Sequence, residues 1–172
     1  SFTSIGCNTA QSSAESADAE QERSLWHPLD VRQKNSFEIV LELMVKRWGR
    51  VDIVVNNAGH AKRTPVQEIS VDEFDEIVAI NMRSVFLSCQ VFGPHMRKNA
   101  YGRIINITSG AVKAPIDMLG LSNGARSGLT GFVAGLARSS IAAQGVTINN
   151  LLPGPFDTDR LQGLFASAAQ KT

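Results

Sequence analysis

The chain contains little cysteine, and its two cysteines stand apart from any metal-binding pattern. Cys7 and Cys89 form neither a C-x-x-C motif nor a cluster with histidine, so neither a zinc site nor a disulfide framework is indicated. Free cysteine is among the most buried residue types, and we expect both side chains to act as small hydrophobic groups. Such cysteine usage predicts a reducing compartment, the cytoplasm, and no bound metal.

The chain also lacks an excess of charge and a long apolar run. Its 17 basic and 16 acidic residues give a net charge of +1 and are mixed along the chain, which argues against a nucleic-acid partner. No apolar run reaches the roughly 18 residues of a membrane span, and the first residues do not resemble a signal peptide. With 43% apolar and 19% charged residues in 172, the composition predicts one globular domain, residues 1–172.

What the chain does have is an alternation of short apolar runs and longer helical patterns. Runs such as Val51–Val55 and Arg103–Ile107 are rich in β-branched residues, as strands buried on both faces are. This alternation predicts an α/β fold with a doubly wound parallel sheet, Rossmann-like, in three α/β/α layers. The expected strands are Phe2–Cys7, Ser24–His27, Val51–Val55, Arg103–Ile107 and Val146–Leu152.

Helix signals fill the intervals between these strands. Asn35 and Glu38 predict a capping-box start for one helix, and Gly49 predicts its end. Ser70 and Glu73 form an S-x-x-E box before a second helix, whose apolar stripe contains Cys89. Two further helices are expected, one short over Ala10–Glu22 and one carrying Ala125, Leu129, Phe132, Val133 and Leu136.

Polar or glycine-containing residues follow four of the expected strands. They are Asp30, Asn56–Gly59, Thr108–Gly110 and Pro153–Pro155. Ligands of doubly wound sheets bind outside the carboxyl ends of the strands, so these residues predict one ligand lying across that edge. Asn81 lies on the apolar stripe of its helix, and its amide either ties the helix to backbone or is a polar group held beside the site, acting through water.

In this order and spacing, these motifs resemble the short-chain dehydrogenase/reductase family, and most of all its 3-oxoacyl-(acyl carrier protein) reductases. The resemblance runs from about Cys7 to Thr158. It implies an NAD(P)(H)-dependent oxidoreductase that reduces a carbonyl or oxidises an alcohol, with a small carbonyl or acyl-thioester substrate. Ser109 would hydrogen-bond the substrate carbonyl, whose oxygen gains negative charge as hydride arrives, and Asn81 would hold a proton-relay water.

The same resemblance implies which residues contact the cofactor. Asp30 and Val31 would touch the adenine ring, and Arg126 would hold the ribose hydroxyls. The remaining contacts implied are Asn56, Asn57, Ala58 and Gly59 along the cleft and Pro153, Gly154 and Thr158 at the nicotinamide. An acidic residue after the family's second strand favours NAD, and Cys7 to Thr9 contain none, which leans slightly toward NADP(H).

The chain departs from the family at the catalytic Tyr-x-x-x-Lys. At the family's spacing after Ser109 stand Ser122 and Arg126. A serine hydroxyl is a far weaker acid than a phenol, so Ser122 is a poor proton donor and could instead be the N-cap of its helix. Arg126 keeps a permanent positive charge and forked donors.

No other residue clearly replaces the tyrosine. Tyr101, the only tyrosine, precedes the strand that leads to Ser109 and cannot fill the role from there. His60, Lys113 and Asp117 remain candidates, and His60 has a suitable reference pKa. The other two histidines, His27 and His95, are expected to be structural or exposed.

Two family segments have no counterpart in this sequence. No G-x-x-x-G-x-G turn is present, and Phe2–Cys7 resembles the family's second strand, so the first strand, with its pyrophosphate-binding turn, and the last strand are missing. The first strand belongs in the middle of the sheet, and its absence predicts a gap there. Leu161–Thr172 resembles only the start of the family's substrate lid.

Four glycines in one helix predict close contact with another subunit. Gly124, Gly128, Gly131 and Gly135 each disfavour helix, and small residues on a helix face permit close approach. Family relatives pair this helix across a dimer interface, so a homodimer or homotetramer is expected. Loss of both Tyr and Lys leaves two alternatives to an active enzyme: a catalytically impaired nucleotide-binding or assembly subunit, and a truncated product that binds nothing.

Overall fold

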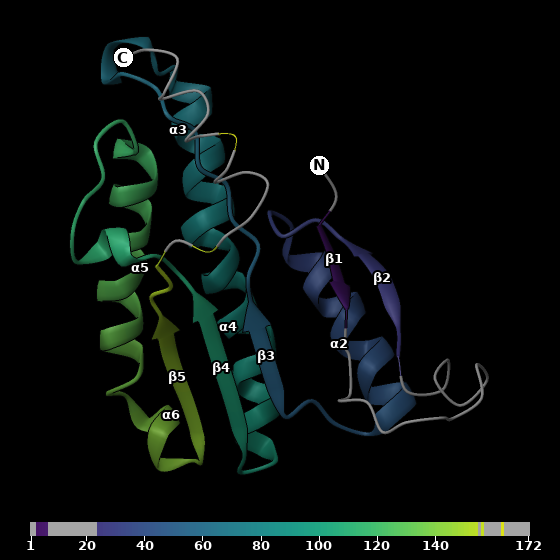
Figure 1. Ribbon diagram of the computed structural model, residues 1–172. Helices are drawn as coiled ribbons and strands as arrows, with labels where there is room; N and C mark the ends of the chain where they lie inside the picture. The colour runs from purple at the N-terminus through teal and green to yellow at the C-terminus, as the bar shows by residue number, and fades with distance from the viewer. Residues whose placement is uncertain (1–2, 7–23, 155, 157–162, 164–172) are drawn as a thin grey trace.

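The computed structural model describes residues 3–6, 24–154, 156 and 163. A three-stranded parallel sheet forms its centre, with β3 (Ile53–Asn56), β4 (Gly102–Ile107) and β5 (Val146–Leu151) side by side in that order (Figure 1). Their ends are in register, because Asn56 is opposite Asn106 and Asn106 is opposite Asn150. The three predicted strands are confirmed within one or two residues, and the parallel pairing brings their carboxyl ends to one edge.

The first two strands form a separate sheet, which differs from the expected single parallel sheet. β1 (Thr3–Gly6) and β2 (Trp26–Leu29) pair antiparallel, with Ser4 opposite Pro28. In the described part of the chain no strand joins β1 to β3, and the sheet is interrupted between them, which is the gap expected without the family's first strand (Figure 1). The backbone N–H and C=O groups of a strand need hydrogen-bond partners, and β1 provides these partners for β2.

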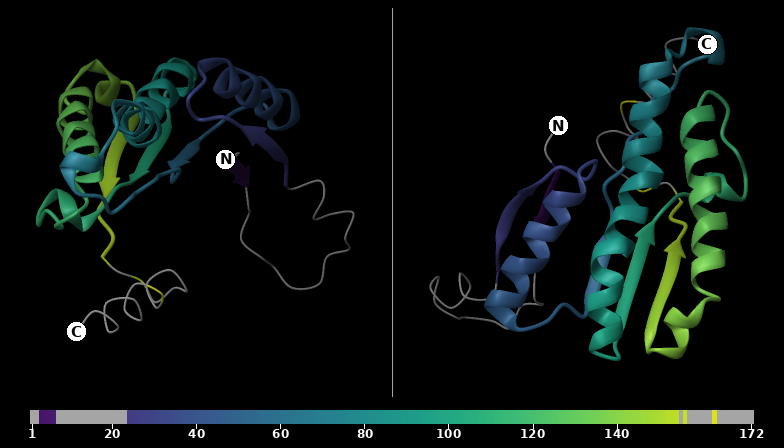
Figure 2. Two further views of the ribbon diagram at one scale, coloured as in Figure 1. Left: turned by 90° about the horizontal axis from the view of Figure 1, so that it is seen from above. Right: turned by 180° about the vertical axis from the view of Figure 1, so that it is seen from behind.

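Helices α2 (Lys34–Trp48), α4 (Ser84–Lys98) and α5 (Gly120–Leu136) lie along one face of the sheets (Figure 2). Their apolar sides meet the buried faces of the strands in one core. The core side chains are Leu29, Val31, Phe37, Val40, Val51, Val85, Cys89, Val91, Phe92, Met96, Ile104, Leu129, Val133, Ile141, Val146 and Ile148. Among the described residues, the opposite face leaves Ile53, Val55 and Leu151 more than half exposed.

The start of α2 differs from the prediction, and its end agrees with it. The N-cap is Gln33, not Asn35, and no side chain caps the helix; Glu38 pairs with Lys34 at 3.3 Å instead of reaching back to a cap. The Glu38 carboxylate therefore forms an i,i+4 ion pair with Lys34 and is not available for a capping box. Gly49 ends the helix in the left-handed region, at φ 81°, as predicted.

The capping box of the next helix is confirmed. Ser70 Oγ accepts from the backbone N–H of Glu73 at 3.2 Å, and Glu73 Oε2 accepts from the N–H of Ser70 at 3.1 Å. From this cap, α3 (Val71–Val78) continues through a π-helical turn, η2 (Ala79–Arg83), into α4. Single π turns within α-helices are frequently found at functional sites, and this one contains Asn81.

The helical stretch Val71–Lys98 is long and apolar enough to cross a membrane by length and composition, with a mean hydropathy of 1.2 in its most apolar window. More than half of that window, 56%, is buried inside the fold, as in the core helix of a globular domain. Met96 and Cys89 on this helix belong to the core. Cys89 is buried as expected, and burial raises the pKa of its thiol to about 11, while Cys7 lies outside the described residues.

The short elements complete the frame. They are the 3-10 turns η1 (Val66–Glu68) and η3 (Gly110–Val112), and the short helix α6 (Ser140–Ala143) before β5. At the base of the sheet, His95 Nε2 accepts from the backbone N–H of Val51 at 3.1 Å, so the expected structural role of His95 is confirmed. The expected helix Ala10–Glu22 and the segment after residue 156, Gly163 excepted, lie outside the described residues.

Candidate active site

A row of three asparagines crosses the sheet where its strands end. Asn56 Nδ2 donates to Asn106 Oδ1 at 2.8 Å, and Asn106 Nδ2 donates to Asn150 Oδ1 at 3.0 Å. Asn106 is fully buried, and each bond joins residues already opposite in register. The three loops that leave the strands therefore start from one hydrogen-bonded line.

Asn81 binds the loop after β3. Its Nδ2 donates to the carbonyl of His60 at 2.6 Å, and its Oδ1 accepts from the N–H of His60 at 2.8 Å. The amide is buried, and these two bonds satisfy it as a backbone tie, one of the two roles the sequence left open. One Nδ2 hydrogen remains for another partner.

Arg126 reaches from α5 to the same edge of the sheet. Its Nη1 donates to the carbonyl of Ile107 at the end of β4 at 3.1 Å, and its Nε donates to Ser122 Oγ at 3.2 Å. Its Nη2 lies beside Gly59, where an added Cβ would come within 2.6 Å of it and within 3.4 Å of Asn81 Oδ1. Gly59 thus permits the close approach of helix side chain and loop.

Ser122 is not the N-cap of its helix. The cap of α5 is Leu119, which caps without a side chain, and Ser122 is the third helical residue. Ser122 is buried, 5% exposed, and its hydroxyl accepts from Arg126. A cap at Ser122 would start the helix at the next residue. The helix starts earlier, because Leu119 is the cap and the two residues before Ser122 are already helical.

Ser109 stands at the end of β4 and caps the 3-10 turn η3. Its Oγ accepts from the N–H of Ala111 at 3.1 Å, which leaves the hydroxyl hydrogen for another acceptor. The N–H of Gly110 donates to the carbonyl of Pro153 at 3.0 Å. This bond joins the loops after β4 and β5, so Ser109 and Pro153 lie at one edge with Asn81 and Arg126.

Asn57 and Ala58 lie in the loop between Asn56 and Gly59, and Gly154 follows Pro153. Asn57 and Gly154 are exposed, Ala58 packs against the core, and no atom would meet a Cβ at Gly154 within 4 Å. Thr158, the last of the expected cofactor contacts, lies outside the described residues.

Asp30 and Val31 are not joined to this cluster by any hydrogen bond or ion pair among the described residues. Asp30 accepts from Arg32 three times, from its backbone N–H at 3.0 Å, Nε at 2.9 Å and Nη2 at 3.0 Å. The hydrogen bonds from the Arg32 side chain lower the pKa of the Asp30 carboxyl. Val31 is 8% exposed and belongs to the core.

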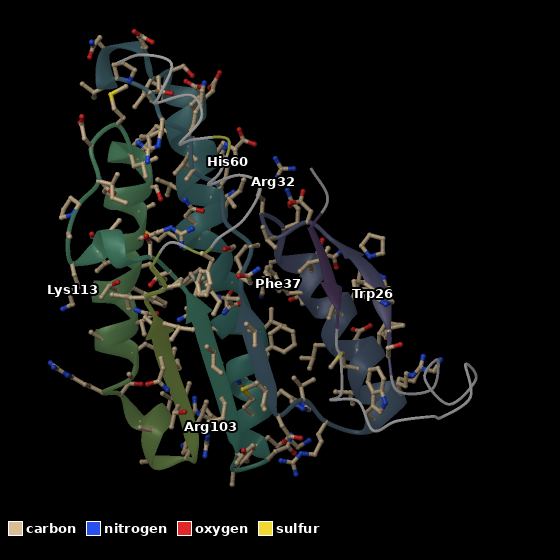
Figure 3. The ribbon with its side chains drawn as sticks, in the orientation of Figure 1. Trp26, Arg32, Phe37, His60, Arg103 and Lys113 are labelled. Carbon is tan, nitrogen blue, oxygen red and sulfur yellow. The ribbon has the colours of Figure 1, made fainter. Side chains whose placement is uncertain are left out.

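The candidate replacements for the tyrosine lie at different distances from the edge. His60 is next to Gly59 and exposed, whereas Lys113, directly after η3, is exposed and points outward at the left of Figure 3. Asp117 is exposed and accepts from the N–H of Met118 at 2.9 Å. Tyr101 stands at the opposite end of β4, 4.4 Å from the Arg103 guanidinium to its ring centroid, and so cannot reach Ser109.

Two features of the site were not predicted. The sequence placed Asn56 there but missed Asn106 and Asn150, although each stands one residue before the end of its strand, close to where Asn56 stands in β3. The contact of Arg126 with the Ile107 carbonyl carries no sequence signal. Of the residues that the structure describes, no group of three His, Cys, Asp or Glu side chains could hold a metal ion.

Comparison with known proteins identifies the family. Residues 3–169 match the model of the short chain dehydrogenases. The chain belongs to the short chain dehydrogenase family. The resemblance inferred from the Asn56, Ser109 and Pro153 motifs is thus confirmed.

Several curated relatives are 3-oxoacyl-[acyl-carrier-protein] reductases. That of Escherichia coli (strain K12) is 36% identical over 138 residues, which are 79% of this chain and 55% of the relative. The D-beta-hydroxybutyrate dehydrogenase of Rhizobium meliloti is 33% identical over 132 residues, 76% of this chain and 50% of the relative. The chain spans about half the length of these relatives.

Solved structures confirm the Rossmann-like fold. The structure of ElxO with NADP bound superposes with a TM-score of 0.75 at 27% identity, covering 82% of this chain and 57% of ElxO. NAD+-bound xylitol dehydrogenase matches with a TM-score of 0.73 at 22% identity, covering 78% and 52% of the two chains, and shows the fold alone. The described strands and helices therefore have the arrangement of a doubly wound domain.

Proposed function

We propose that this chain forms the central part of an NAD(P)(H)-dependent oxidoreductase that reduces a carbonyl or oxidises an alcohol, as in 3-oxoacyl-thioester reductases. One observation supports this most. Loops after three parallel strands are tied to each other and to Asn81 and Arg126 at the carboxyl edge of the sheet. Dinucleotides bind at that edge in doubly wound folds.

The residues at this edge fit the nicotinamide half of the cofactor. Gly59 and Gly154 offer backbone without side chains, and Asn57, two residues before Gly59, is exposed. Arg126 keeps N–H groups for ribose hydroxyls after its bonds to Ile107 and Ser122. Bound there, the cofactor would supply or accept a hydride. We assign it as NADP(H) in slight preference to NAD(H), on the absence of an acidic residue in Cys7 to Thr9.

Within this proposal Ser109 is the oxyanion donor. The carbonyl oxygen of a substrate gains negative charge as hydride arrives, and a hydroxyl held in place stabilises that charge. Ser109 Oγ is held by the N–H of Ala111, which directs its free hydrogen away from that bond. Asn81 has one amide hydrogen for a water, and the proton donor is left to His60 as the exposed titratable group beside the site.

The proposal is tested by turnover of NADPH or NADH with a short acetoacetyl thioester. We expect Ser109→Ala to reduce kcat about 10²–10³-fold, as for loss of one oxyanion donor. Ser139→Ala, which removes a hydroxyl that caps α6 far along the chain, serves as the control and should leave kcat unchanged. An unchanged rate in Ser109→Ala would remove that residue from the mechanism.

A specific observation also favours a second function, a catalytically impaired nucleotide-binding or assembly subunit. The tyrosine position is occupied by a buried serine whose hydroxyl is bound to Arg126. Cofactor binding without turnover above background would support this subunit. A flat thermal-shift titration with both cofactors would instead support a product that binds neither.

We also propose that the protein is a cytoplasmic homodimer or homotetramer that pairs through α5. At Gly124, Gly131 and Gly135 an added Cβ would meet no atom within 4 Å, so this side of the helix is open to a partner. Beside it, the Phe86 ring, 45% exposed, packs edge-on against Phe132 at 5.9 Å between centroids. A monomer peak in light scattering at micromolar concentration would argue against this assembly.

A further inference from the structure

The side chain of His95 accepts a hydrogen bond from the backbone just before β3. The N–H of Val51 donates to His95 Nε2 at 3.1 Å, although 44 positions separate the two residues in the sequence. Val51 is 3% exposed and belongs to the core, and a buried N–H that loses its acceptor costs free energy. The bond therefore holds the start of β3 to the last turn of α4.

The geometry requires one form of the imidazole ring. A backbone N–H can only donate, so His95 Nε2 must be the unprotonated, accepting nitrogen of a neutral ring. Asn99 Nδ2 lies 3.1 Å from the same nitrogen, and an amide NH2 group also donates. A protonated ring carries a hydrogen on both nitrogens, and its Nε2–H would point at the N–H of Val51. The folded arrangement thus fits neutral His95 and does not fit the cation.

The bond lies where the two sheets of the chain are joined. Helix α2 ends shortly before Val51, and β3 begins shortly after it. Within the described residues no strand connects β1 with β3, so side-chain contacts between α2 and α4 must hold the two sheets together (Figure 1). One such contact is the ring pair Phe37 and Phe92, edge-on at 6.4 Å between centroids. This ring pair does not titrate, whereas an imidazole does.

The charges around the last turn of α4 act in both directions. The carbonyl end of a helix favours a positive charge, which by itself would promote protonation of His95. Basic side chains of the neighbouring elements oppose a further positive charge, and the carboxylate of Asp52 already accepts from Arg50 Nε at 2.7 Å. The titratable groups of these elements are Glu42, Lys46 and Arg47 of α2, Arg50 and Asp52 before β3, Arg97 and Lys98 of α4, and Tyr101 and Arg103 around the start of β4. Because these influences oppose each other, the hydrogen bonds to Nε2 select the neutral ring.

We infer that the hydrogen bond between His95 and Val51 is a pH-sensitive contact that joins the unit of β1, β2 and α2 to the central sheet. Neutral His95 holds the N–H of Val51 and fixes the start of β3. When the ring takes up a proton from solvent at Nε2, this bond breaks and the chain before β3 opens locally. Histidine is the side chain that titrates near neutral pH, with a reference pKa of about 6.5. The inference concerns the fold and does not depend on the proposed oxidoreductase function.

Hydrogen exchange of the Val51 amide in the full chain measures this contact directly. The protection factor compares the exchange rate with that of an unstructured amide at the same pH, so it reports opening of the structure alone. If opening requires one proton on His95, the protection factor of Val51 should fall up to about tenfold for each pH unit below about 6.5. A protection factor that stays constant from about pH 8 to about pH 5 would overturn the inference.

Glutamine variants separate the hydrogen bond from the proton. In His95→Gln an amide oxygen replaces Nε2 as the acceptor but takes up no proton in this range, so the protection factor of Val51 should not change with pH. The chain has three histidines, and His27→Gln and His60→Gln are the matched controls, which should keep the wild-type pH dependence. Wild-type pH dependence in a folded His95→Gln, checked by circular dichroism, would assign the response to another group and overturn the inference.

Two further measurements test the form of the ring and the local character of the opening. The ¹⁵N shifts of the His95 ring at about pH 8 should identify Nδ1 as the protonated nitrogen, and a protonated Nε2 would contradict its role as acceptor. Ile104, fully buried in the middle strand β4, should lose much less protection than Val51 over the same pH range. Equal losses at the two amides would show that acid unfolds the whole domain, which would overturn the inference of a local contact.

Discussion

Asn81 holds both the carbonyl and the N–H of His60 with one buried amide, at 2.6 and 2.8 Å. The tie joins the π turn of the long helix to the loop that follows β3. Because His60 directly follows Gly59, these hydrogen bonds also hold Gly59 in its position beside Arg126. Asn81 lies within the π turn that interrupts the regular helix over Ala79–Arg83, and its side chain is buried there.

Replacing this amide should destabilise the protein. In Asn81→Leu the two backbone groups of His60 lose their partner, and each lost hydrogen bond costs about 0.5–1.5 kcal/mol because His60 itself is exposed to water. We expect a fall of about 1–3 kcal/mol in the free energy of unfolding, measured with urea. Asn149→Leu, at an exposed position of β5, is the control and should change stability little. Equal effects of the two substitutions would show that the tie contributes nothing.

The asparagine row gives a second prediction. Asn106→Ala leaves Asn56 Nδ2 and Asn150 Oδ1 without their partners and opens a space in a fully buried position. The expected loss is about 2–4 kcal/mol in the free energy of unfolding. Asn106→Ala in an Asn56→Ala, Asn150→Ala background should cost less, because no partner is stranded. Additive losses in this comparison would contradict coupling along the row.

Two glycines share a left-handed backbone conformation but differ in their surroundings, so substituting each one distinguishes backbone strain from steric contact. Gly49 and Gly145 have φ of 81° and 77°, but a Cβ at Gly49 would meet nothing within 4 Å, while one at Gly145 would lie 2.2 Å from the carbonyl oxygen of Ala100. Gly49→Ala should therefore cost about 1 kcal/mol, the strain of a left-handed residue. Gly145→Ala should cost distinctly more, since a backbone carbonyl must move. Thermal melts of the two variants should differ by several degrees, and equal midpoints would show that the turn adapts.

Much of this fold could be predicted because its signals are local. The Ser70 cap, the Gly49 end and the β-branched strand Ile53–Asn56 depend on residues within a few positions of each other. The pairing of β1 with β2 could not be predicted in this way, because it depends on which strand is available beside β2. Pairing partners are set by the whole sheet.

In the site, too, the residues with local signals could be predicted, and the contacts that depend on packing could not. Motifs at strand ends identified Asn56, Ser109 and Pro153, since parallel strands bring their carboxyl ends together. The interaction of Arg126 with Ile107 depends on how α5 packs, and no pattern within the helix encodes it. The capping role suggested for Ser122 was wrong because the cap is Leu119, three residues before that serine, and the helix begins at Gly120.

Asp30 provides a prediction about pH. Hydrogen bonds from the side chain and backbone of Arg32 hold the pKa of its carboxyl below the ordinary value in the folded state. Because the folded pKa is depressed, the ionised Asp30 carboxylate stabilises the folded state. This contribution is fully present above the unfolded pKa of about 3.9 and is lost as pH falls through the folded pKa. Asp30→Asn removes the charge, so its free energy of unfolding should be lower than that of the wild type near neutral pH. The difference should shrink below about pH 4 and vanish where Asp30 is protonated. Urea titrations at several pH values measure it, with Asp117→Asn in the exposed loop before α5 as the control. A gap that stays constant down to acid pH would show that the loss comes from geometry and not from the charge.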